Sequence, residues 1–180
     1  AGMINKFINK NNINDPIIIS HSFGGRITAI LINKYNIPAK KIILIDVAGI
    51  KRFNLKIFIK QKIYKFIKIM INLLPLKYRY IIYKKTFNYF SSNDYKNLPP
   101  NMYKTFKNII KENIKNHYKK IKTGTLIIWG KNDKDTPIKD AYLLNRIIKS
   151  SKLIIYKNSG HFSYLDNIEK INKEIEEYIK

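Results

Sequence analysis

The sequence contains no cysteine among its 180 residues. Disulfide bonds and thiolate metal sites are therefore excluded, and a reducing compartment fits best, so we expect a cytoplasmic protein. The N-terminus is polar and rich in asparagine, without the apolar block of a secretory signal peptide. No stretch approaches the ~18 uncharged apolar residues that a membrane span needs, because Lys or Arg interrupts every long hydrophobic run.

Acidic residues are scarce, since 12 Asp and Glu stand against 35 Lys and Arg, which gives a formal net charge of +23. Such an excess is typical of proteins that bind nucleic acid or anionic membranes. Lysine supplies nearly all of it, whereas guanine and phosphate readout favours arginine. Ile, Lys, Asn, Tyr and Phe are abundant together, which indicates compositional drift in an AT-rich genome. We therefore predict no specific nucleic-acid partner and keep an anionic membrane surface as an alternative.

Short apolar runs alternate with amphipathic segments in both outer parts of the chain. The runs predict strands at 16–20, 42–47, 125–129 and 153–156, and the amphipathic segments predict helices at 3–14, 24–35, 141–150 and 167–180. A continuous apolar run is typical of a strand covered on both faces of a parallel sheet. Asp166, with Glu169 three residues on, is expected to cap the last helix. This order predicts an α/β fold, a parallel sheet with flanking helices.

The middle of the chain, 51–120, lacks strand patterning and is predicted to be a helical insertion between two parts of the core, 1–50 and 121–180. From Val47 to Asn93 the sequence has eleven Lys and Arg and no Asp or Glu. One helical stripe of apolar residues runs through this region and ends at Pro75. Its members are Leu55, Ile59, Ile63, Phe66, Met70 and Leu73.

The segment Ile19-Ser20-His21-Ser22-Phe23-Gly24-Gly25 lies between an expected strand and an expected helix. This is the context of a nucleophile elbow, a tight turn that raises a serine hydroxyl above the carboxyl edge of a sheet. Small residues are needed beside the nucleophile because strand and helix approach closely, and Gly24 and Gly25 meet that need. The free N–H groups of the following helix favour developing negative charge at this point.

On these residues the chain resembles the α/β-hydrolase fold superfamily, in the group of serine hydrolases that includes carboxylesterases and carbon–carbon bond hydrolases. The resemblance covers essentially all 180 residues, and the helical insertion resembles the family's lid. The family's Gly-x-Ser-x-Gly is Ser20-His21-Ser22-Phe23-Gly24 here, with Ser20 in place of the first glycine. The resemblance implies that Ser22 is the nucleophile and that the Phe23 backbone N–H is one oxyanion-hole donor.

Two further motifs follow expected strands. Gly130-Lys131-Asn132-Asp133-Lys134-Asp135-Thr136-Pro137 resembles the family's Gly-x-x-Asp-x-x-x-Pro, which implies that Asp133 is the triad acid. Ser159-Gly160-His161-Phe162 resembles the Gly-His turn that bears the general base, which implies that role for His161. The order Ser, Asp, His is the one that this fold uses. Asp135 and Asp46 are the alternatives for the acid.

The chemistry requires these residue types. A serine hydroxyl is a poor nucleophile until a base takes its proton, and an imidazole can accept that proton and return it to the leaving group. A carboxylate fixes the imidazole tautomer and stabilises the imidazolium. We therefore expect a serine hydrolase that acts on esters or related carbonyl substrates through an acyl-enzyme, with a small-molecule substrate, no cofactor and no metal. His21 is expected to pack beside the elbow, with a second base as the alternative, and His117 to lie at the surface.

The family places further strands before the elbow strand, and one of them ends in the loop that supplies the second oxyanion donor. Residues 1–15 predict no such strand. We therefore expect an open apolar sheet edge at 16–20, which is a hazard for unwanted pairing, and poor ester hydrolysis by this chain alone. The alternative function is a non-catalytic remnant or interaction protein. It would bind the missing N-terminal segment or another chain at the open edge, or an anionic membrane surface through the basic lid.

Overall fold

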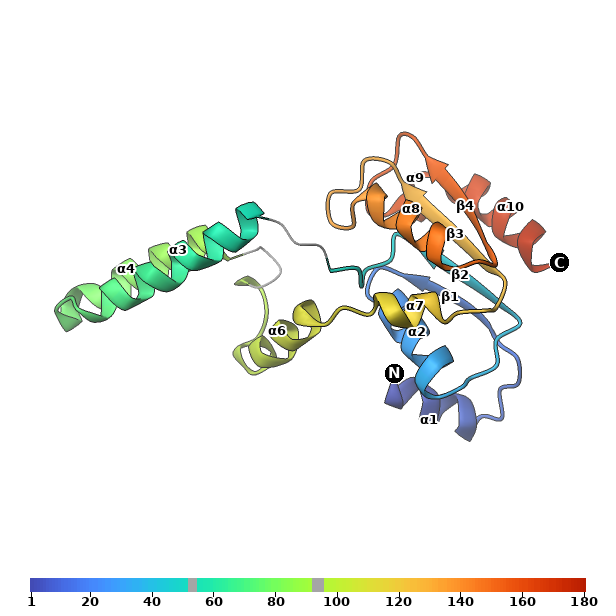
Figure 1. Cartoon of the computed structure of the whole chain (residues 1–180), viewed down its shortest axis with the longest axis horizontal. Coiled ribbons are helices and arrows are strands. Elements are labelled where there is room, and N and C mark those ends of the chain that lie inside the picture. The colour runs from blue at the N-terminus through green and yellow to red at the C-terminus, as the bar shows by residue number, and fades with distance from the viewer. Residues whose placement is uncertain (52–54, 92–95) are drawn as a thin grey trace. The chain divides into compact units, whose positions relative to one another are not determined.

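The computed structural model describes residues 1–51, 55–91 and 96–180 (Figure 1). The chain divides into two compact units, of which the first comprises residues 1–50 and 113–180 and the second residues 51–112. In the first unit the elements are α1 (Gly2–Lys10), β1 (Ile17–His21), α2 (Gly24–Lys34), β2 (Lys41–Ile45), α7 (Lys115–Lys119), β3 (Thr125–Gly130), α8 (Ile138–Ile147), β4 (Ser151–Tyr156), α9 (Ser163–Asp166) and α10 (Ile168–Ile179). In the second they are α3 (Leu55–Asn72), α4 (Leu76–Phe90), the 3₁₀ turn η1 (Pro100–Met102) and α6 (Tyr103–Lys111). None of the helices among the described residues is long and apolar enough to cross a bilayer.

Four parallel strands form the sheet of the first unit, in the order β1-β2-β3-β4. Neighbouring parallel strands need a crossover connection, which α2 supplies between β1 and β2 and α8 supplies between β3 and β4. The predicted α/β fold with a parallel sheet and flanking helices is confirmed. Because all four strands run the same way, the loops that follow them meet at one edge of the sheet, where the site lies.

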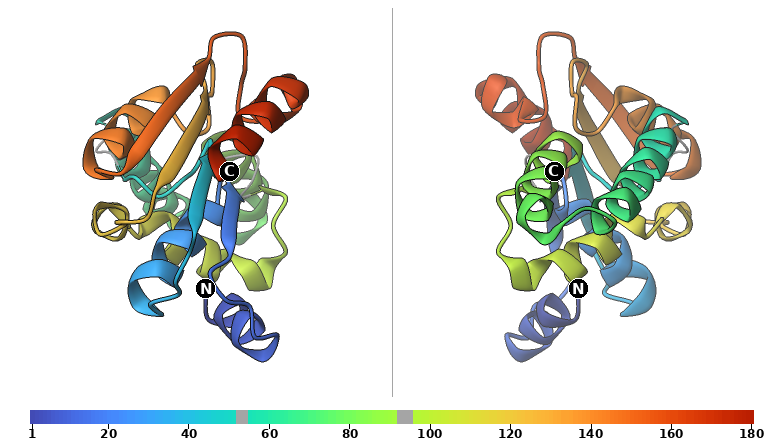
Figure 2. Two further views of the ribbon diagram at one scale, coloured as in Figure 1. Left: turned by 90° about the vertical axis from the view of Figure 1, so that its right-hand side faces the viewer. Right: turned by 90° about the vertical axis from the view of Figure 1, so that its left-hand side faces the viewer.

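Both faces of the central strands are covered by helices. Ile42 and Leu44 of β2 belong to a cluster with α2, α7 and α8, whereas Ile43 and Ile45 belong to a cluster with α10. This alternation follows from the pleat, which points successive side chains to opposite faces. Figure 2 shows α8 and α10 on opposite sides of the sheet. The continuous apolar runs of β2 and β3 are thus explained by burial on both faces.

The edge strand β1 departs from the prediction that each apolar run is a strand buried on both faces of the sheet. Ile17 and Ile19 are 38% and 55% exposed, although their run is as apolar as that of β2. Ile19 is in register with Ile43, so it points to the face on which α10 packs. The cluster on that face is built from β2, β3 and β4 and does not include β1. The prediction of burial on both faces is therefore wrong for β1.

Residues 113–120, which the sequence assigned to the insertion, pack in the first unit. Ile114 and Tyr118 are 0% exposed, and Tyr118 donates its hydroxyl to the Ala48 carbonyl at 2.7 Å. His117 on the same helix is partly buried rather than at the surface, and its carbonyl accepts the side-chain N–H of Asn33 at 2.8 Å. This segment is bound to the sheet through β2 and α2.

The last helix begins differently from the prediction. Asn167 precedes α10, and Asp166 is the final residue of the short helix α9. The Asp166 carboxylate accepts the Gly160 N–H at 3.1 Å and makes no cap bond to α10. The prediction that Asp166 caps the last helix is therefore wrong. Its carboxylate instead hydrogen-bonds to the turn that carries His161.

The second unit is helical in its described residues, in accord with the sequence pattern. The rings of Tyr64 and Phe90 lie 5.3 Å apart, and Lys68 Nζ lies 5.4 Å from the centre of the Tyr83 ring, so α3 and α4 pair as an antiparallel hairpin. The helix α3 ends before Pro75 as predicted. The members of the predicted apolar stripe, from Leu55 to Leu73, are 46–73% exposed.

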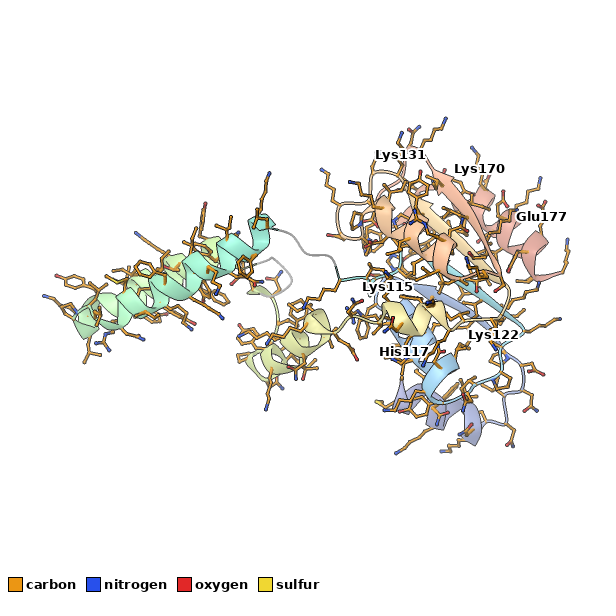
Figure 3. All side chains as sticks on the ribbon, viewed as in Figure 1. Lys115, His117, Lys122, Lys131, Lys170 and Glu177 are labelled. Atoms are coloured by element: carbon orange, nitrogen blue, oxygen red, sulfur yellow. The ribbon has the colours of Figure 1, made fainter. Side chains whose placement is uncertain are left out.

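Basic side chains are distributed over the surface of the first unit. Figure 3 shows Lys115, Lys122, Lys131 and Lys170 at separate positions, on α7, before β3, after β3 and on α10. All four are exposed. The positive charge of this unit is therefore spread over several elements.

Candidate active site

The turn between β1 and α2 holds Ser22 in an unusual backbone conformation. Its φ is 49°, in the left-handed region that a residue with a Cβ adopts only under constraint. The constraint comes from three hydrogen bonds. The Ser22 N–H donates to the Ile45 carbonyl at 3.1 Å, and the Ser22 carbonyl accepts the N–H groups of Gly25 and Ala48 at 3.2 and 2.9 Å. This is the geometry of a nucleophile elbow, which lifts a serine hydroxyl above the sheet edge.

Close packing explains the small residues around Ser22. A Cβ on Gly25 would lie 2.4 Å from the Val47 Cβ, and a Cβ on Gly24 would lie 3.2 Å from the Ser20 Cβ. The first position of the motif therefore has to be small when the helix packs this closely on β1. Serine meets that demand at position 20, where its hydroxyl reaches the Ile43 carbonyl at 3.4 Å.

The side chains of Ser22, His161 and Asp133 form one chain of hydrogen bonds. His161 Nε2 lies 2.9 Å from Ser22 Oγ, and His161 Nδ1 lies 2.8 Å from Asp133 Oδ2. A carboxylate only accepts, so Nδ1 carries a proton and Nε2 is the nitrogen free to accept the serine proton. The Asp133 side chain is 0% exposed and that of His161 is 13% exposed, which shields the pair from water.

The turn after β3 fixes the Asp133 carboxylate. Oδ1 accepts the backbone N–H groups of Asp135 and Thr136, each at 2.8 Å, and Oδ2 accepts the Thr136 hydroxyl. Asp135 thus contributes its backbone amide, while its side chain is exposed. Thr136 was missed by the sequence reasoning, although a hydroxyl three residues after an aspartate is a recognisable turn pattern.

Asp46, the other alternative for the acid, does not contact the His161 ring. Its Oδ1 accepts the Gly130 N–H at 2.8 Å, and its Oδ2 accepts both the N–H and the hydroxyl of Ser163, at 3.1 and 2.6 Å. Burial raises the pKa of the Asp46 carboxyl, these hydrogen bonds lower it, and the nearby charge of Asp133 raises it. Ser163 is a further residue that the motifs did not single out.

The end of β3 and the turn before His161 touch directly. A Cβ on Gly130 would lie 2.1 Å from the Gly160 carbonyl oxygen, closer than any two such atoms can approach. The glycine of the Asp133 motif is therefore required by packing against the Gly-His turn.

His21 lies beside the elbow, as predicted. Its Nε2 is 2.7 Å from the His161 carbonyl oxygen, and its ring centroid is 4.9 Å from that of His161 and 5.0 Å from that of Tyr164. A carbonyl oxygen only accepts, so His21 Nε2 carries the proton. His21 therefore contacts the main chain of the proposed base.

Asp133, Asp135 and His161 have potential metal-ligand atoms within 4.8 Å of one another. Carboxylate oxygens and an imidazole nitrogen suit several divalent ions. In this structure, however, His161 Nδ1 and Asp133 Oδ2 are hydrogen-bonded to each other, and both Asp133 oxygens accept bonds from the turn. This arrangement favours an acid–base pair over a metal site.

Comparisons with known proteins agree with this architecture. Residues 106–180 match the family described as TAP-like protein. Over 67 residues the chain is 37% identical to the AB hydrolase superfamily protein YisY of Bacillus subtilis (strain 168), a stretch that covers 37% of this chain and 25% of that protein.

Three solved structures cover 98% of this chain each. An α/β-hydrolase, MGS-MChE2, from the metagenome of sediments of the Mar Chica lagoon is 19% identical with a TM-score of 0.63. The esterase EaEST of Exiguobacterium antarcticum is 20% identical with a TM-score of 0.66, and a bromoperoxidase of Bacillus anthracis is 14% identical with a TM-score of 0.67. The chain spans 66%, 70% and 71% of these proteins, respectively, and a quarter of the length of YisY. From its sheet, its elbow and these likenesses, the chain has the fold of the α/β-hydrolases.

Proposed function

We propose that the protein is a serine hydrolase that cleaves esters or related carbonyl substrates through an acyl-enzyme. The observation that carries the proposal is the position of the His161 ring, 2.9 Å from Ser22 Oγ on one side and 2.8 Å from Asp133 Oδ2 on the other. A nucleophile, a base in contact with it and a group that orients the base are the components that acyl transfer needs.

In the first step Ser22 Oγ attacks the substrate carbonyl carbon while His161 Nε2 takes the hydroxyl proton. The oxyanion of the tetrahedral intermediate accepts the Phe23 N–H at the start of α2, where the helix end favours negative charge. His161 then gives its proton to the leaving oxygen, and the carbon–oxygen bond breaks. Water attacks the acyl-enzyme by the same route in reverse, with His161 again as the base. Asp133 stays ionised and stabilises the imidazolium in each step.

Aromatic side chains beside the reacting groups favour a substrate with an apolar part. Phe23 follows Ser22 and Phe162 follows His161, and they are 47% and 50% exposed. An apolar acyl or alcohol group that covered them would remove this surface from water. We therefore expect higher kcat/KM for aromatic or medium-length alkyl esters than for acetate esters.

The exposed edge of β1 favours a second candidate, an interaction protein that pairs with a partner strand. Ile17 and Ile19 expose apolar surface on a strand with one unpaired side, and such an edge can accept another chain. Under this candidate the side chains of Ser22, Asp133 and His161 would be retained although the protein does not turn over a substrate. A location in the cytoplasm stays a prediction under both candidates.

Hydrolysis of p-nitrophenyl butyrate, together with labelling by a fluorophosphonate, tests the first candidate. Ser22→Ala should lower kcat on the order of 10⁶-fold and abolish the label on the peptide that contains position 22. Ser20→Ala is the matched control, because Ser20 lies in the same motif but its hydroxyl, among the described residues, hydrogen-bonds only to the Ile43 carbonyl. Equal turnover in Ser22→Ala and wild type would contradict the assignment. Absence of both turnover and label, with capture of a partner strand at β1, would favour the second candidate.

A further inference from the structure

Asp46 lies directly after β2, where its main chain is held on both sides. Its N–H donates to the Ile128 carbonyl of β3 at 3.0 Å, and its carbonyl oxygen lies 3.1 Å from the Thr136 hydroxyl oxygen. The residue is 0% exposed, and its φ of 47° lies in the left-handed region. A buried aspartate in this conformation persists only where the surrounding structure over-determines it.

The hydrogen-bond partners of the Asp46 side chain, among the residues that the structure describes, are all donors. They are the N–H of Gly130 at 2.8 Å and the N–H and hydroxyl of Ser163 at 3.1 and 2.6 Å. An ionised carboxylate offers acceptors only and satisfies all three, whereas the amide of an asparagine would direct an N–H₂ at one of these donors. The three donors therefore match the two oxygens of a carboxyl group better than the amide of asparagine.

The donors belong to two different turns of the active site. Gly130 stands three residues before Asp133, and Ser163 stands two residues after His161. We propose that Asp46 is a positioning residue, whose carboxylate clamps these two turns together and holds Asp133 at hydrogen-bond distance from His161. The expected effect of this clamp on kcat rests on the proposed function. Its expected effect on the contact between Asp133 and His161 does not.

Asp46 acts through the main chain and not on the imidazole itself. His161 Nδ1 is engaged by Asp133 at 2.8 Å and approached by the Thr136 hydroxyl at 3.3 Å, and Nε2 is engaged by Ser22. Loss of the clamp should therefore misalign the base without removing its partners. Small misplacements of reacting groups reduce the rate of the chemical step, so kcat should fall while KM changes little.

The test is Asp46→Asn, with Leu31→Ala as the matched control. Leu31 is 2% exposed in a separate cluster with Ile8 and Ile37, so its truncation lowers stability without touching the site. Two quantities are measured below the Tm of both variants, namely the kinetics of ester hydrolysis and the proton NMR signal of the His161 Nδ1–H. Asp46→Asn should lower kcat about 10–10²-fold, with KM within about threefold, and should shift or broaden the signal. Leu31→Ala should leave both quantities unchanged.

A lower Tm in Asp46→Asn with unchanged kcat and an unchanged NMR signal would overturn the proposal. If that variant does not fold, Ser163→Ala replaces it, because this change removes the hydroxyl donor and keeps the N–H. Ser163→Ala should shift the signal in the same direction, and an unchanged signal would again overturn the clamp. If the wild-type protein shows neither turnover nor labelling by a fluorophosphonate, the proposed function fails and the NMR comparison still decides the role of Asp46.

Discussion

His21 Nε2 donates to the main-chain carbonyl of His161 at 2.7 Å, so the residue before Ser22 holds the backbone of His161. The two rings also lie 4.9 Å apart at an interplanar angle of 50°. This contact joins β1 to the turn after β4, which are at opposite edges of the described sheet.

Replacement of His21 by alanine should therefore lower kcat with little change in KM. We expect a loss of about 10-fold or more, because the base loses one of the contacts that fix its backbone, and misalignment of reacting groups is costly. His21→Gln is the matched variant, since its side-chain N–H can occupy the place of Nε2–H and should restore most of the rate. Steady-state hydrolysis of p-nitrophenyl butyrate measures both. Equal rates in wild type and His21→Ala would show that this contact does not position His161.

Hydrolysis should survive removal of divalent metal ions. The groups with ligand atoms suited to such an ion, Asp133 and His161, are hydrogen-bonded to each other at 2.8 Å, and the proposed mechanism needs no Lewis acid. Dialysis against EDTA should leave kcat/KM unchanged, and Asp135→Asn should do the same, because Asp133 uses only the backbone N–H of Asp135. If dialysis abolished activity and added zinc or manganese restored it, a metal site at Asp133, Asp135 and His161 would be established instead.

The sequence predicted the parts of this structure that depend on local pattern. The continuous apolar runs of β2 and β3 predicted buried parallel strands, and the pattern of small residues around Ser22 predicted the elbow. Asp133 and His161 could be placed because each follows a strand, and parallel strands bring their carboxyl ends to one edge. The structure joins these side chains through hydrogen bonds that span 139 and 28 residues of sequence.

Features that depend on contacts between distant segments could not be predicted in this way. Asp46 follows a strand just as Asp133 follows one, and only the three-dimensional register shows that it faces Gly130 and Ser163 instead of the imidazole. The pattern at Asp166 is that of a helix cap, but its carboxylate bonds to Gly160 because α9 intervenes. For β1 the sequence supported two expectations: its apolar run predicted burial on both faces, whereas the lack of a predicted strand in residues 1–15 predicted an open edge. The structure places β1 at the edge of the described sheet with Ile17 and Ile19 exposed.

Gly130→Ala should destabilise the protein, whereas Gly160→Ala should not. A Cβ on Gly130 would lie 2.1 Å from the Gly160 carbonyl oxygen, so the two turns of the site would have to separate. Overpacking of this kind costs about 1–3 kcal/mol and occasionally more. A Cβ on Gly160 would meet nothing within 4 Å, which makes it the matched control on the other side of the same contact. Urea unfolding of both variants measures the difference, and equal free energies of unfolding would contradict the packing described here.

The stability contributed by Asp46 should depend on pH with a defined sign. Burial is the largest cause that raises its pKa above 3.8, so the folded protein holds this proton over a pH range in which the unfolded chain has released it. Where the folded state binds more protons, the free energy of unfolding falls as the pH rises. This contribution is thus fully present below 3.8 and is lost as the pH rises through the folded-state pKa. The free energy of unfolding of Asp46→Asn relative to wild type should therefore rise with pH over this range, as measured by urea unfolding at a series of pH values. A difference that falls with pH would show that the hydrogen bonds outweigh burial.

The basic residues of the α3–α4 hairpin determine how strongly the protein should bind polyanionic partners such as nucleic acid or an anionic membrane. Nine of the 35 Lys and Arg and none of the 12 Asp and Glu lie between residues 55 and 91. If this excess reflects compositional drift, binding to duplex DNA should be weak, should fall steeply with added salt and should show no sequence preference, because only counterion release drives it.

Two sets of charge variants separate drift from a dedicated surface. One neutralises Lys56, Lys62 and Lys65 on α3 to glutamine, and the other neutralises Lys149, Lys157 and Lys173 of the first unit, all of them exposed. Under drift both sets should weaken binding to DNA and to anionic vesicles alike. Each set should also reduce the slope of the logarithm of DNA affinity against the logarithm of salt concentration, by the equivalent of about three phosphate contacts. Vesicle binding that is lost only with the α3 set would instead support the membrane-facing lid, since each lysine near an anionic bilayer contributes about 1 kcal/mol. Binding to DNA that survives physiological salt would contradict drift and would favour a nucleic-acid partner.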